Sequence, residues 1–169
     1  MTVGRVSTIA MIAALMLAVP SRWAASEGTS LQMQLVGTWT LSSWIQVRQD
    51  GSRFHRFGLN PNGIQIFDAK SNFFALFARP DLSAVANPQA PTPEEANALL
   101  QGAVGYFGTY TLDAEFRVMK LRVSASTFPN LLAADNQRRI TSVTADELKF
   151  VDTSVTSEGQ TFVVMKRAR

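Results

Sequence analysis

Residues 35–48 read Leu35-Val36-Gly37-Thr38-Trp39-Thr40-Leu41-Ser42-Ser43-Trp44-Ile45-Gln46-Val47-Arg48, and this stretch decides the fold. From Gly37 to Val47 the odd positions are mostly apolar and the even positions mostly polar. A repeat of two residues is typical of a β-strand with one buried face. The Gly-x-Trp at its start fits the first strand of a closed β-barrel.

Short strand-like runs, separated by turn residues, follow this stretch to the end of the chain. Asp50-Gly51 and Asn60-Pro61-Asn62-Gly63 are two of the turn signals. Strands are expected over residues 53–57, 64–68, 73–78, 106–112, 116–125, 138–144, 148–155 and 161–167. About eight to ten short strands at this spacing predict an antiparallel all-β barrel or sandwich. Residues 73–78 are apolar at every position, so we expect this strand to be covered on both faces, by the barrel interior and by a packed helix.

One helix interrupts the strands. Thr92 is a favourable N-cap, Pro93 suits the first helical position, and Glu95 completes a capping box. Apolar residues then recur at helical spacing, which predicts one apolar stripe that ends near Gly105 or Gly108. The stripe comprises Ala96, Leu99, Leu100, Ala103, Val104 and Phe107. Residues 80–93 hold four of the seven prolines and predict a loop at the barrel rim.

The first 26 residues have the features of a secretory signal peptide. Arg5 supplies a positive charge, residues 9–19 form an apolar run, and Pro20 and small residues follow. The run is shorter than the ~20 residues that a membrane-spanning helix needs. We therefore expect a signal peptide over residues 1–26, a folded domain over residues 31–169, no membrane span after cleavage, and a secreted or periplasmic protein. An uncleaved membrane anchor is the alternative.

Composition excludes several kinds of site. The chain has no cysteine, which excludes thiol catalysis and thiolate metal sites, and His55 is its single histidine. We expect no metal and no cofactor. The net charge of +3 falls to +1 beyond the expected signal peptide, where 14 basic and 13 acidic residues remain. No basic stripe is interleaved with aromatic residues, so a nucleic-acid partner is not expected.

Five segments in order make the chain resemble the bacterial and fungal lipocalin-like domain family, which consists of small calycin-type barrels. They are residues 35–39 (Leu-Val-Gly-Thr-Trp), 77–81 (Phe-Ala-Arg-Pro-Asp), 92–95 (Thr-Pro-Glu-Glu), 106–110 (Tyr-Phe-Gly-Thr-Tyr) and 126–130 (Ser-Thr-Phe-Pro-Asn), with Gln137-Arg138 after the last. The resemblance covers nearly the whole chain beyond the signal peptide. It implies an antiparallel up-and-down barrel with one helix at its side or mouth, and a small-molecule site more than a known reaction.

The resemblance also implies a role for Trp39. In calycin barrels such a tryptophan closes one end, and an arginine from a late strand packs across it, a cation–π contact worth about 0.5–2 kcal/mol. Arg138, Arg139 and Arg167 are the candidates, and Arg138 is the one we name. The chain departs from the family where a histidine pair is expected before the Ser-x-x-Pro-Asn motif, because Leu121-Arg122 stands there.

The candidate ligand-binding residues combine aromatic surface with a few polar groups. Two of them, Tyr106 and Tyr110, share one strand face, where they serve either as core or as a cavity wall with hydrogen-bonding phenols. Arg122 is a surface charge if its face meets solvent, or an anion anchor if that face is interior. Asn130 either completes a corner or reaches a ligand at the barrel mouth. The full set is Phe73, Phe77, Tyr106, Tyr110, Arg122, Phe128 and Asn130.

Three functions remain open from the sequence. The first is a binding protein that holds a small hydrophobic molecule in the barrel, which eight strands are wide enough to do. The second is an isomerase or cyclase that acts on a small metabolite in the same cavity. The third is a structural or interaction module that uses the proline-rich rim and the helix. An ionisable interior group with a strongly shifted pKa would favour catalysis.

Overall fold

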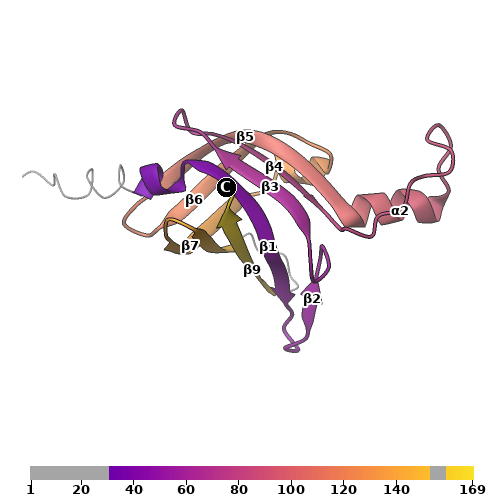
Figure 1. Cartoon of the computed structure of the whole chain (residues 1–169), viewed down its shortest axis with the longest axis horizontal. Coiled ribbons are helices and arrows are strands. Elements are labelled where there is room, and N and C mark those ends of the chain that lie inside the picture. The colour runs from indigo at the N-terminus through magenta and orange to yellow at the C-terminus, as the bar shows by residue number, and fades with distance from the viewer. Residues whose placement is uncertain (1–30, 153–158) are drawn as a thin grey trace, which may run out of the picture.

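A computed structural model describes residues 31–152 and 159–169 of the chain (Figure 1). The expected signal peptide lies outside the described residues, so its assignment stays a prediction. No helix in the described part of the chain is long and apolar enough to cross a membrane.

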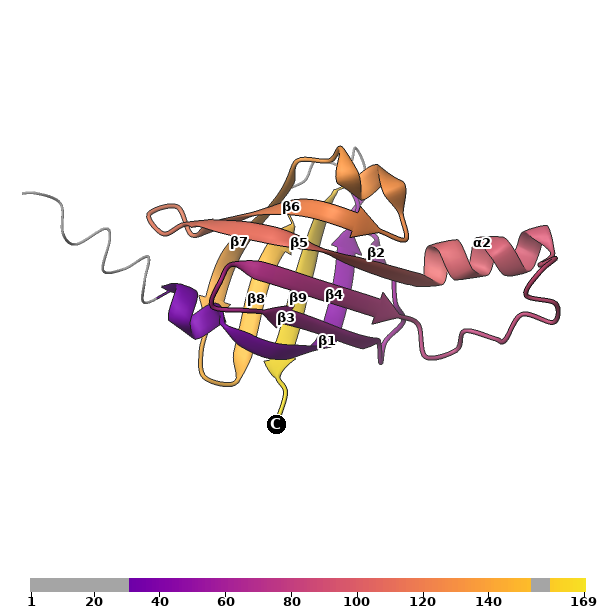
Figure 2. The same cartoon turned by 90° about the horizontal axis from the view of Figure 1, so that it is seen from above.

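Nine antiparallel strands form one sheet that closes on itself (Figure 2). The elements are β1 (Gly37–Val47), β2 (Arg53–His55), β3 (Asn62–Phe67), β4 (Asn72–Ala78), α2 (Pro93–Gly102), β5 (Ala103–Asp113), β6 (Val118–Ser126), the 3₁₀-helix η1 (Pro129–Leu132), β7 (Asn136–Val143), β8 (Glu147–Asp152) and β9 (Gln160–Arg167). Pairing between β1 and β9 closes an eight-strand barrel, and β2 is an extra strand beside β1. The predicted up-and-down antiparallel barrel is confirmed.

β1 changes its inward face part-way along. Trp39 and Leu41 are buried on odd positions, but Trp44 is the next fully inward residue. The register with β9 shifts between Leu41 and Ser43, which marks a β-bulge. One extra residue turns every later side chain to the opposite face. Ile45 therefore points outward, although simple alternation from Trp39 would place it in the core.

The helix is shorter and less covered than its apolar pattern predicts. The capping box is confirmed, because Thr92 Oγ1 accepts a hydrogen bond from the Glu95 amide and the Glu95 carboxylate accepts one from the Thr92 amide. The helix ends at Gly102, so Ala103, Val104 and Phe107 belong to β5. α2 extends away from the barrel in Figure 2, and Leu99 and Leu100 are exposed.

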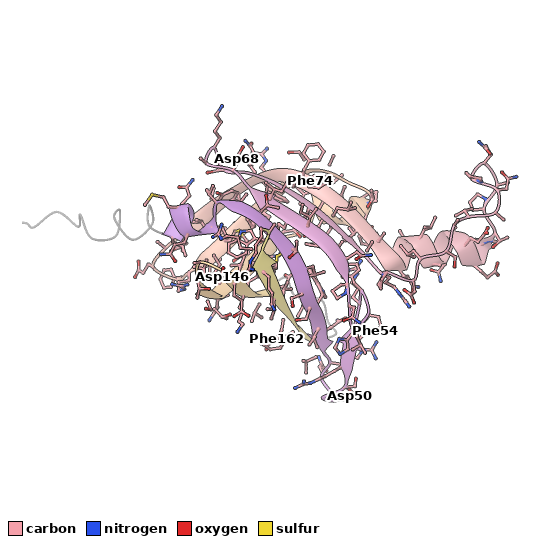
Figure 3. The ribbon with its side chains drawn as sticks, in the orientation of Figure 1. Asp50, Phe54, Asp68, Phe74, Asp146 and Phe162 are labelled. Carbon is pink, nitrogen blue, oxygen red and sulfur yellow. The ribbon has the colours of Figure 1, made fainter. Side chains whose placement is uncertain are left out.

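The outer face of β4 lacks the helical cover that its apolar sequence suggested. Phe73, Ala75 and Phe77 point into the core, whereas Phe74 and Leu76 are 41% and 46% exposed. Figure 3 shows the Phe74 ring on the outer surface. Because α2 leaves the barrel instead of packing on it, the expectation of a strand covered on both faces is wrong.

One end of the barrel is sealed by a helical segment, residues 31–35, together with Trp39 and Arg167, and we call this end the floor. Leu31 and Leu35 are buried, and the indole nitrogen of Trp39 donates to the Leu35 main-chain oxygen at 2.8 Å. The guanidinium carbon of Arg167 lies 4.1 Å from the centre of the Trp39 ring. The floor is thus closed by packing and by one cation–π contact.

The opposite end of the barrel is closed by Trp44, Phe57 and Phe77, which we call the aromatic cluster. The ring centre of Phe57 lies 5.6 Å from that of Trp44 and 5.9 Å from that of Phe77. Phe57 is only 1% exposed, although it comes from the connection between β2 and β3 and not from a strand. The barrel interior is the space between the floor and this cluster.

Candidate functional site

Arg138 on β7 points into the barrel and is 4% exposed. Its Nη2 donates a hydrogen bond of 2.9 Å to the hydroxyl oxygen of Tyr106 on β5. Its guanidinium carbon lies 5.2 Å from the ring centre of Phe150 and 5.8 Å from that of Tyr106. The Nε and Nη1 atoms have no hydrogen-bond partner among the described residues. A buried charge with unused donors is costly, so these donors call for an acceptor.

One carboxylate balances the charge of Arg138. Asp152, directly opposite on β8, places Oδ2 3.8 Å from Nη2 of Arg138. Burial acts to lower the pKa of Arg138, but Tyr106 and Asp152 outweigh it and hold the pKa above its usual value. Arg138 therefore stays protonated inside the barrel and is suited to bind a negative or strongly polar oxygen.

Gln65 on β3 is a second interior polar residue with unused hydrogen-bonding capacity. Its side chain is fully buried, and neither Nε2 nor Oε1 has a partner among the described residues. The register runs from Gln65 across Ala75 to Tyr106. Adjacent strands lie roughly 4.8 Å apart, so two strand spacings separate Gln65 from Tyr106. Because the side chain of Ala75 is small, it projects little into the interior between Gln65 and Tyr106.

Arg56 is a second arginine at the end of the barrel that the aromatic cluster closes. It precedes Phe57 in the connection between β2 and β3, and its guanidinium carbon lies 5.3 Å from the centre of the Phe57 ring. Burial lowers the pKa of Arg56, and the nearby oxygen of Tyr106 partly offsets that effect. No carboxylate of the described residues forms an ion pair with Arg56. Gln65, Tyr106 and Arg138, all buried, form what we call the interior polar group, whereas Arg56 is half-exposed beside Phe57.

The structure separates the aromatic candidates predicted from the sequence. Phe73, Phe77 and Tyr106 are buried together, with Tyr106 ring contacts of 5.8 Å to Phe73 and 6.2 Å to Phe77. Tyr110 belongs to the floor, because its hydroxyl donates to the Asp68 main-chain oxygen at 3.0 Å and its ring packs on Phe67. These aromatic residues form the wall and the base of the interior.

The other candidates lie at or beyond the barrel rim. Phe128 is half-buried against the core. Arg122 is exposed on β6, between the inward residues Leu121 and Val123, so the interior position considered for it is wrong. Asn130 is exposed in η1 and corresponds to the corner alternative. Whether any of the predicted residues contacts a ligand stays a prediction.

A comparison with protein families decides the assignment of the chain. The profile of a family described as "Lipocalin-like domain" matches residues 36–168. The chain belongs to the lipocalin-like domain family. No curated protein matches it. A solved structure, "Structure of a redesigned beta barrel", is similar over 82% of this chain and 95% of its own, at 14% identity and a TM-score of 0.43.

In this lipocalin-like barrel the arginine that packs on Trp39 is Arg167, which corrects the choice of Arg138. Arg167 is opposite Trp39 in the β1–β9 register, and it also donates to the main-chain oxygens of Val36 at 3.0 Å and Gln34 at 2.7 Å. Arg138 instead lies opposite Met119 and Asp152, deeper in the barrel. The floor therefore uses one arginine, and the interior polar group uses the other.

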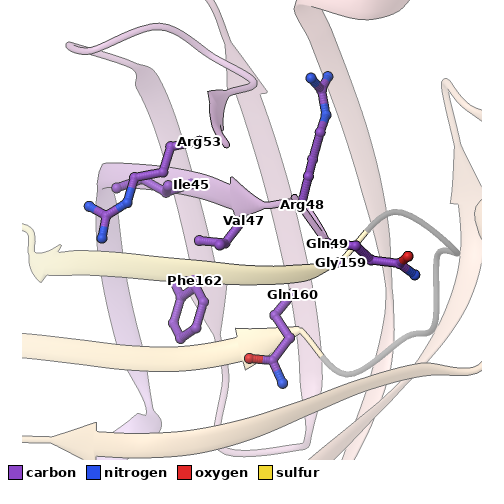
Figure 4. A pocket seen from close by; sticks show the side chains of 8 residues that line it. All are labelled: Ile45, Val47, Arg48, Gln49, Arg53, Gly159, Gln160 and Phe162. Atoms are coloured by element: carbon purple, nitrogen blue, oxygen red, sulfur yellow. The ribbon is translucent and has the colours of Figure 1, made fainter. Parts of the chain in front are cut away.

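A separate pocket of about 580 Å³ lies outside the lipocalin-like barrel (Figure 4). Ile45 and Phe162 line it from the outward faces of β1 and β9, since their neighbours Trp44 and Val163 point into the core. Arg48 and other residues of the β1–β2 hairpin complete its wall; the full lining is Ile45, Val47, Arg48, Gln49, Arg53, Gly159, Gln160 and Phe162. This pocket shares no residue with the interior polar group.

Sequence reasoning missed Gln65 and Arg56. Gln65 lies between two isoleucines in sequence, but its own position is the inward one, since Gln65 is fully buried and Ile66 is 37% exposed. A glutamine at an inward position of a short strand was the available signal. Arg56 gave no such signal because it lies in a connection. Among the described residues, no group of three or more histidine or acidic side chains is arranged to hold a metal ion.

Proposed function

We propose that this lipocalin-like protein binds a small, largely apolar molecule inside its barrel. The observation that carries the proposal is a wall of aromatic side chains around buried polar atoms whose hydrogen bonds are not used within the described residues. Small-molecule sites in proteins combine mainly apolar walls with a few oriented polar groups. If the interior served stability alone, replacing those polar atoms with apolar ones would raise the free energy of unfolding.

The buried charge of Arg138 is better suited to binding an oxygen than to transferring a proton. A group that transfers protons works best with a pKa near the working pH. The surroundings of Arg138 move its pKa further from neutrality, so the guanidinium keeps its charge and serves to hold an oxygen. The proposal therefore names a carrier or sensor of a small molecule, with isomerase or cyclase activity as the alternative.

Access to the interior is proposed at Phe57. This residue closes the end opposite the floor, and it is held by ring contacts to Trp44 and Phe77 from a connection that follows the three-residue strand β2. Displacing one ring from a loop requires less rearrangement than opening the ladder between two strands. A ligand's apolar body would then replace the ring against the same neighbours.

The test measures uptake of N-phenyl-1-naphthylamine, a neutral apolar fluorescent probe, by the purified full chain. We expect fluorescence enhancement, with faster uptake by Phe57→Leu than by the native protein. Phe54→Leu, which changes an exposed ring three residues earlier in the chain, should leave the rate unchanged. Native mass spectrometry after incubation with a metabolite extract gives an independent result. Absence of both probe binding and any added mass would refute the proposal.

We also propose that the protein acts in the periplasm or outside the cell after loss of residues 1–26. The support is the basic residue, apolar run and small residues described above. N-terminal sequencing of protein recovered from the periplasm or medium should begin near residue 27. Recovery of the uncleaved chain in the cytoplasm would contradict this proposal.

A further inference from the structure

We infer that two copies of this chain form a two-fold dimer, in which α2 of each copy lies on the outer face of β3, β4 and β5 of the other. Neither surface belongs to the barrel interior, so this dimer is a property beyond the proposed ligand binding. Two exposed apolar surfaces point to it, together with the junction that separates them within one chain and the charges beside them.

The first surface is a set of exposed apolar side chains on the outside of the barrel, which we call the outer patch. It comprises Ile66, Phe74, Leu76 and Phe107, which are between 37% and 50% exposed (Figure 3). Phe74 lies opposite Ile66 on one side and opposite Phe107 on the other, so these three form one row across the strands. Leu76 is the next outward residue along β4. A contiguous exposed apolar surface of this kind marks a contact with another molecule.

The second surface is the apolar side of α2, formed by Ala96, Leu99 and Leu100, which we call the helix stripe. All three residues are exposed, and their spacing of three and four places them on one side of the helix. α2 has only 10 residues. Isolated helices shorter than about 12–15 residues are marginal in water, and most helices gain their stability by packing an apolar side. A cover over the helix stripe is therefore expected.

The junction between α2 and β5 keeps the helix stripe away from the outer patch of its own chain. The helix ends at Gly102 and β5 begins at Ala103, so no turn separates them. The Gly102 oxygen accepts a hydrogen bond of 2.8 Å from the Arg79 amide, and a Cβ on Gly102 would lie 2.6 Å from the Leu82 side chain. These contacts direct α2 away from the barrel, as Figure 2 shows. Folding α2 back over its own β4 and β5 would break them.

A two-fold axis near this junction lets each surface cover the other. With the axis there, α2 of one copy runs antiparallel to α2 of its partner and continues over the start of the partner's β5. A helix of 10 residues spans about 15 Å, and β5 spans about 13 Å from Ala103 to Phe107. The helix thus matches the length of the outer patch along β5. Both copies make the same contact, as in the self-complementary interface of a closed dimer.

The exposed apolar area is sufficient for a stable dimer. A fully exposed large apolar side chain offers about 150–200 Å², so the outer patch with Leu99 and Leu100 would bury roughly 450 Å² in each copy. Apolar atoms make up about 65% of a homodimer interface, so the whole contact would remove roughly 1,400 Å² from water. Stable interfaces bury about 1,200–2,000 Å².

Charge is also complementary between α2 and the strand that borders the outer patch. The charged residues of α2 are Glu94 and Glu95, both in its first turn. Arg122 points outward from β6 opposite Thr109, the next outward residue after Phe107 on β5. The first turn is the part of α2 that reaches farthest along the partner's β5, so its acids approach Arg122. Helices that lie on membranes are instead rich in lysine and arginine, so a second copy fits α2 better than a lipid surface does.

Sedimentation velocity of the purified protein from about 1 to about 100 μM measures the dimer, and we expect a monomer–dimer equilibrium in this range. Phe74→Lys in the outer patch and Leu100→Glu in the helix stripe should each raise the dissociation constant at least about tenfold, because each places a charge in an apolar contact. Phe162→Lys is the matched control. It makes the same change at a ring that is 41% exposed on the outer side of β9, and it should leave the dissociation constant unchanged.

Cross-linking tests which surfaces meet. The chain has no cysteine, so Leu100→Cys and Leu76→Cys proteins, mixed and treated with a short bismaleimide, react only through the introduced thiols. One variant is labelled with ¹⁵N, and the mixed product is identified by its mass. We expect a mixed product from this pair. With Phe162→Cys in place of Leu76→Cys, the mixed product should be absent.

A native protein that stays monomeric throughout this range, or a dimer that survives both Phe74→Lys and Leu100→Glu, would overturn the inference. Equal yields of mixed product with Leu76→Cys and Phe162→Cys would do the same. A monomer that sediments with phosphatidylcholine–phosphatidylglycerol vesicles would assign the outer patch to a lipid surface instead. Uptake of N-phenyl-1-naphthylamine by the same samples checks that the exposed substitutions leave the barrel folded, and it reports on the proposed function independently of the dimer.

Discussion

At the scale of single residues, the floor depends on Gly37. Its φ is +137°, and a Cβ built on it would lie 2.5 Å from Nη1 of Arg167. The same nitrogen donates to the Val36 main-chain oxygen, and the guanidinium covers Trp39. The Gly-x-Trp pair is thus one device: the glycine leaves room for the arginine, and the arginine covers the tryptophan.

We predict that Gly37→Ala destabilises the protein by at least about 2 kcal/mol, because it combines a disfavoured backbone conformation with displacement of Arg167. Urea unfolding measures the change in the free energy of unfolding. Gly51→Ala is the control, since Gly51 also has a positive φ of +80° but its Cβ would meet nothing within 4 Å. Gly51→Ala should lower the free energy of unfolding by about 1 kcal/mol. Equal losses for the two variants would show that the Arg167 contact is not the reason for Gly37.

The role of Trp39 could be predicted from the sequence, but its partner could not. Arg138, Arg139 and Arg167 all lie on late strands beside apolar residues, and local pattern does not distinguish them. Only the closure of β9 onto β1 places Arg167 opposite Trp39. That pairing joins residues at the two ends of the described chain, so it is set by the whole barrel and leaves no trace in short-range spacing.

At the scale of elements, α2 is capped by its own sequence and only lightly held by the barrel. Thr92 Oγ1 accepts a hydrogen bond from the Glu95 amide at 3.2 Å, and Glu95 Oε2 accepts one from the Thr92 amide at 2.8 Å. We predict that Thr92→Ala increases amide exchange within α2 about fivefold, as expected for loss of an N-cap worth about 1 kcal/mol. The free energy of global unfolding should not change by more than about 0.5 kcal/mol.

Thr144→Ala is the comparison variant, because Thr144 lies in a turn of the barrel and not in the projecting helix. Thr144 Oγ1 accepts hydrogen bonds from the amides of Asp146 and Glu147 in the turn between β7 and β8. Because this turn joins two strands of the barrel, loss of its bonds should lower the free energy of global unfolding by about 1 kcal/mol. If Thr92→Ala lowers global stability as much as Thr144→Ala does, α2 belongs to the cooperative unit and its projection from the barrel is misleading.

The turn between β3 and β4 is held by Asp68 and makes stability depend on pH. Its carboxylate accepts bonds from the Asn72 side chain and from the amides of Lys70 and Asn72. Bonds from Asn72, followed by the Lys70 amide, lower the pKa of Asp68 below 3.8. A lowered folded pKa means that the charged form stabilises the protein fully above the unfolded value, and that this contribution is lost as the pH falls through the folded value.

We therefore predict that native protein and Asp68→Asn differ in stability by the same amount at pH 7 and pH 5.5. The difference should shrink below pH 3.8, where the native carboxylate gains a proton. Urea unfolding at pH 7, 5.5 and 3 measures it. A difference that stays constant down to pH 3 would show that the charge of Asp68 is not what holds the turn.

Two features of the elements escaped prediction for one physical reason. The helical pattern continued past Gly102 because Val104 and Phe107 fit a helical stripe and also lie on an alternating strand. The bulge after Leu41 exchanged the two faces of β1, and it is visible only in the register with β9. Strand pairing overrides local periodicity at both places, since the paired backbone hydrogen bonds decide which residues face inward.

At the scale of the whole molecule, closing the sheet creates an interior that must be filled or used. The barrel and its aromatic wall could be predicted, since alternation and family resemblance both indicate them. The polar part of the site could be predicted only at Tyr106, because Gln65 and Arg138 lie far from it in sequence, on β3 and β7. Only the closed barrel turns both side chains into the interior that Tyr106 lines.

If the interior polar group is retained for ligand binding, replacing one of its members should stabilise the unliganded protein. We predict that Gln65→Met raises the free energy of unfolding by about 1–3 kcal/mol, because it removes a buried amide whose hydrogen bonds are not made within the described residues. The measurement is urea unfolding without added ligand. The same variant should bind N-phenyl-1-naphthylamine at least as well as the native protein does, since its interior is more apolar.

Asn136→Leu is the matched comparison and should have the opposite sign. Asn136 is also a buried amide, but its Nδ2 donates to the main-chain oxygens of Leu131 at 2.8 Å and Ala134 at 3.2 Å. Its replacement leaves those oxygens without their donor and should lower stability by about 1–3 kcal/mol. If Gln65→Met also destabilised the protein by this amount, the Gln65 amide would be satisfied in solution, and its polar atoms would no longer indicate a place kept for a ligand.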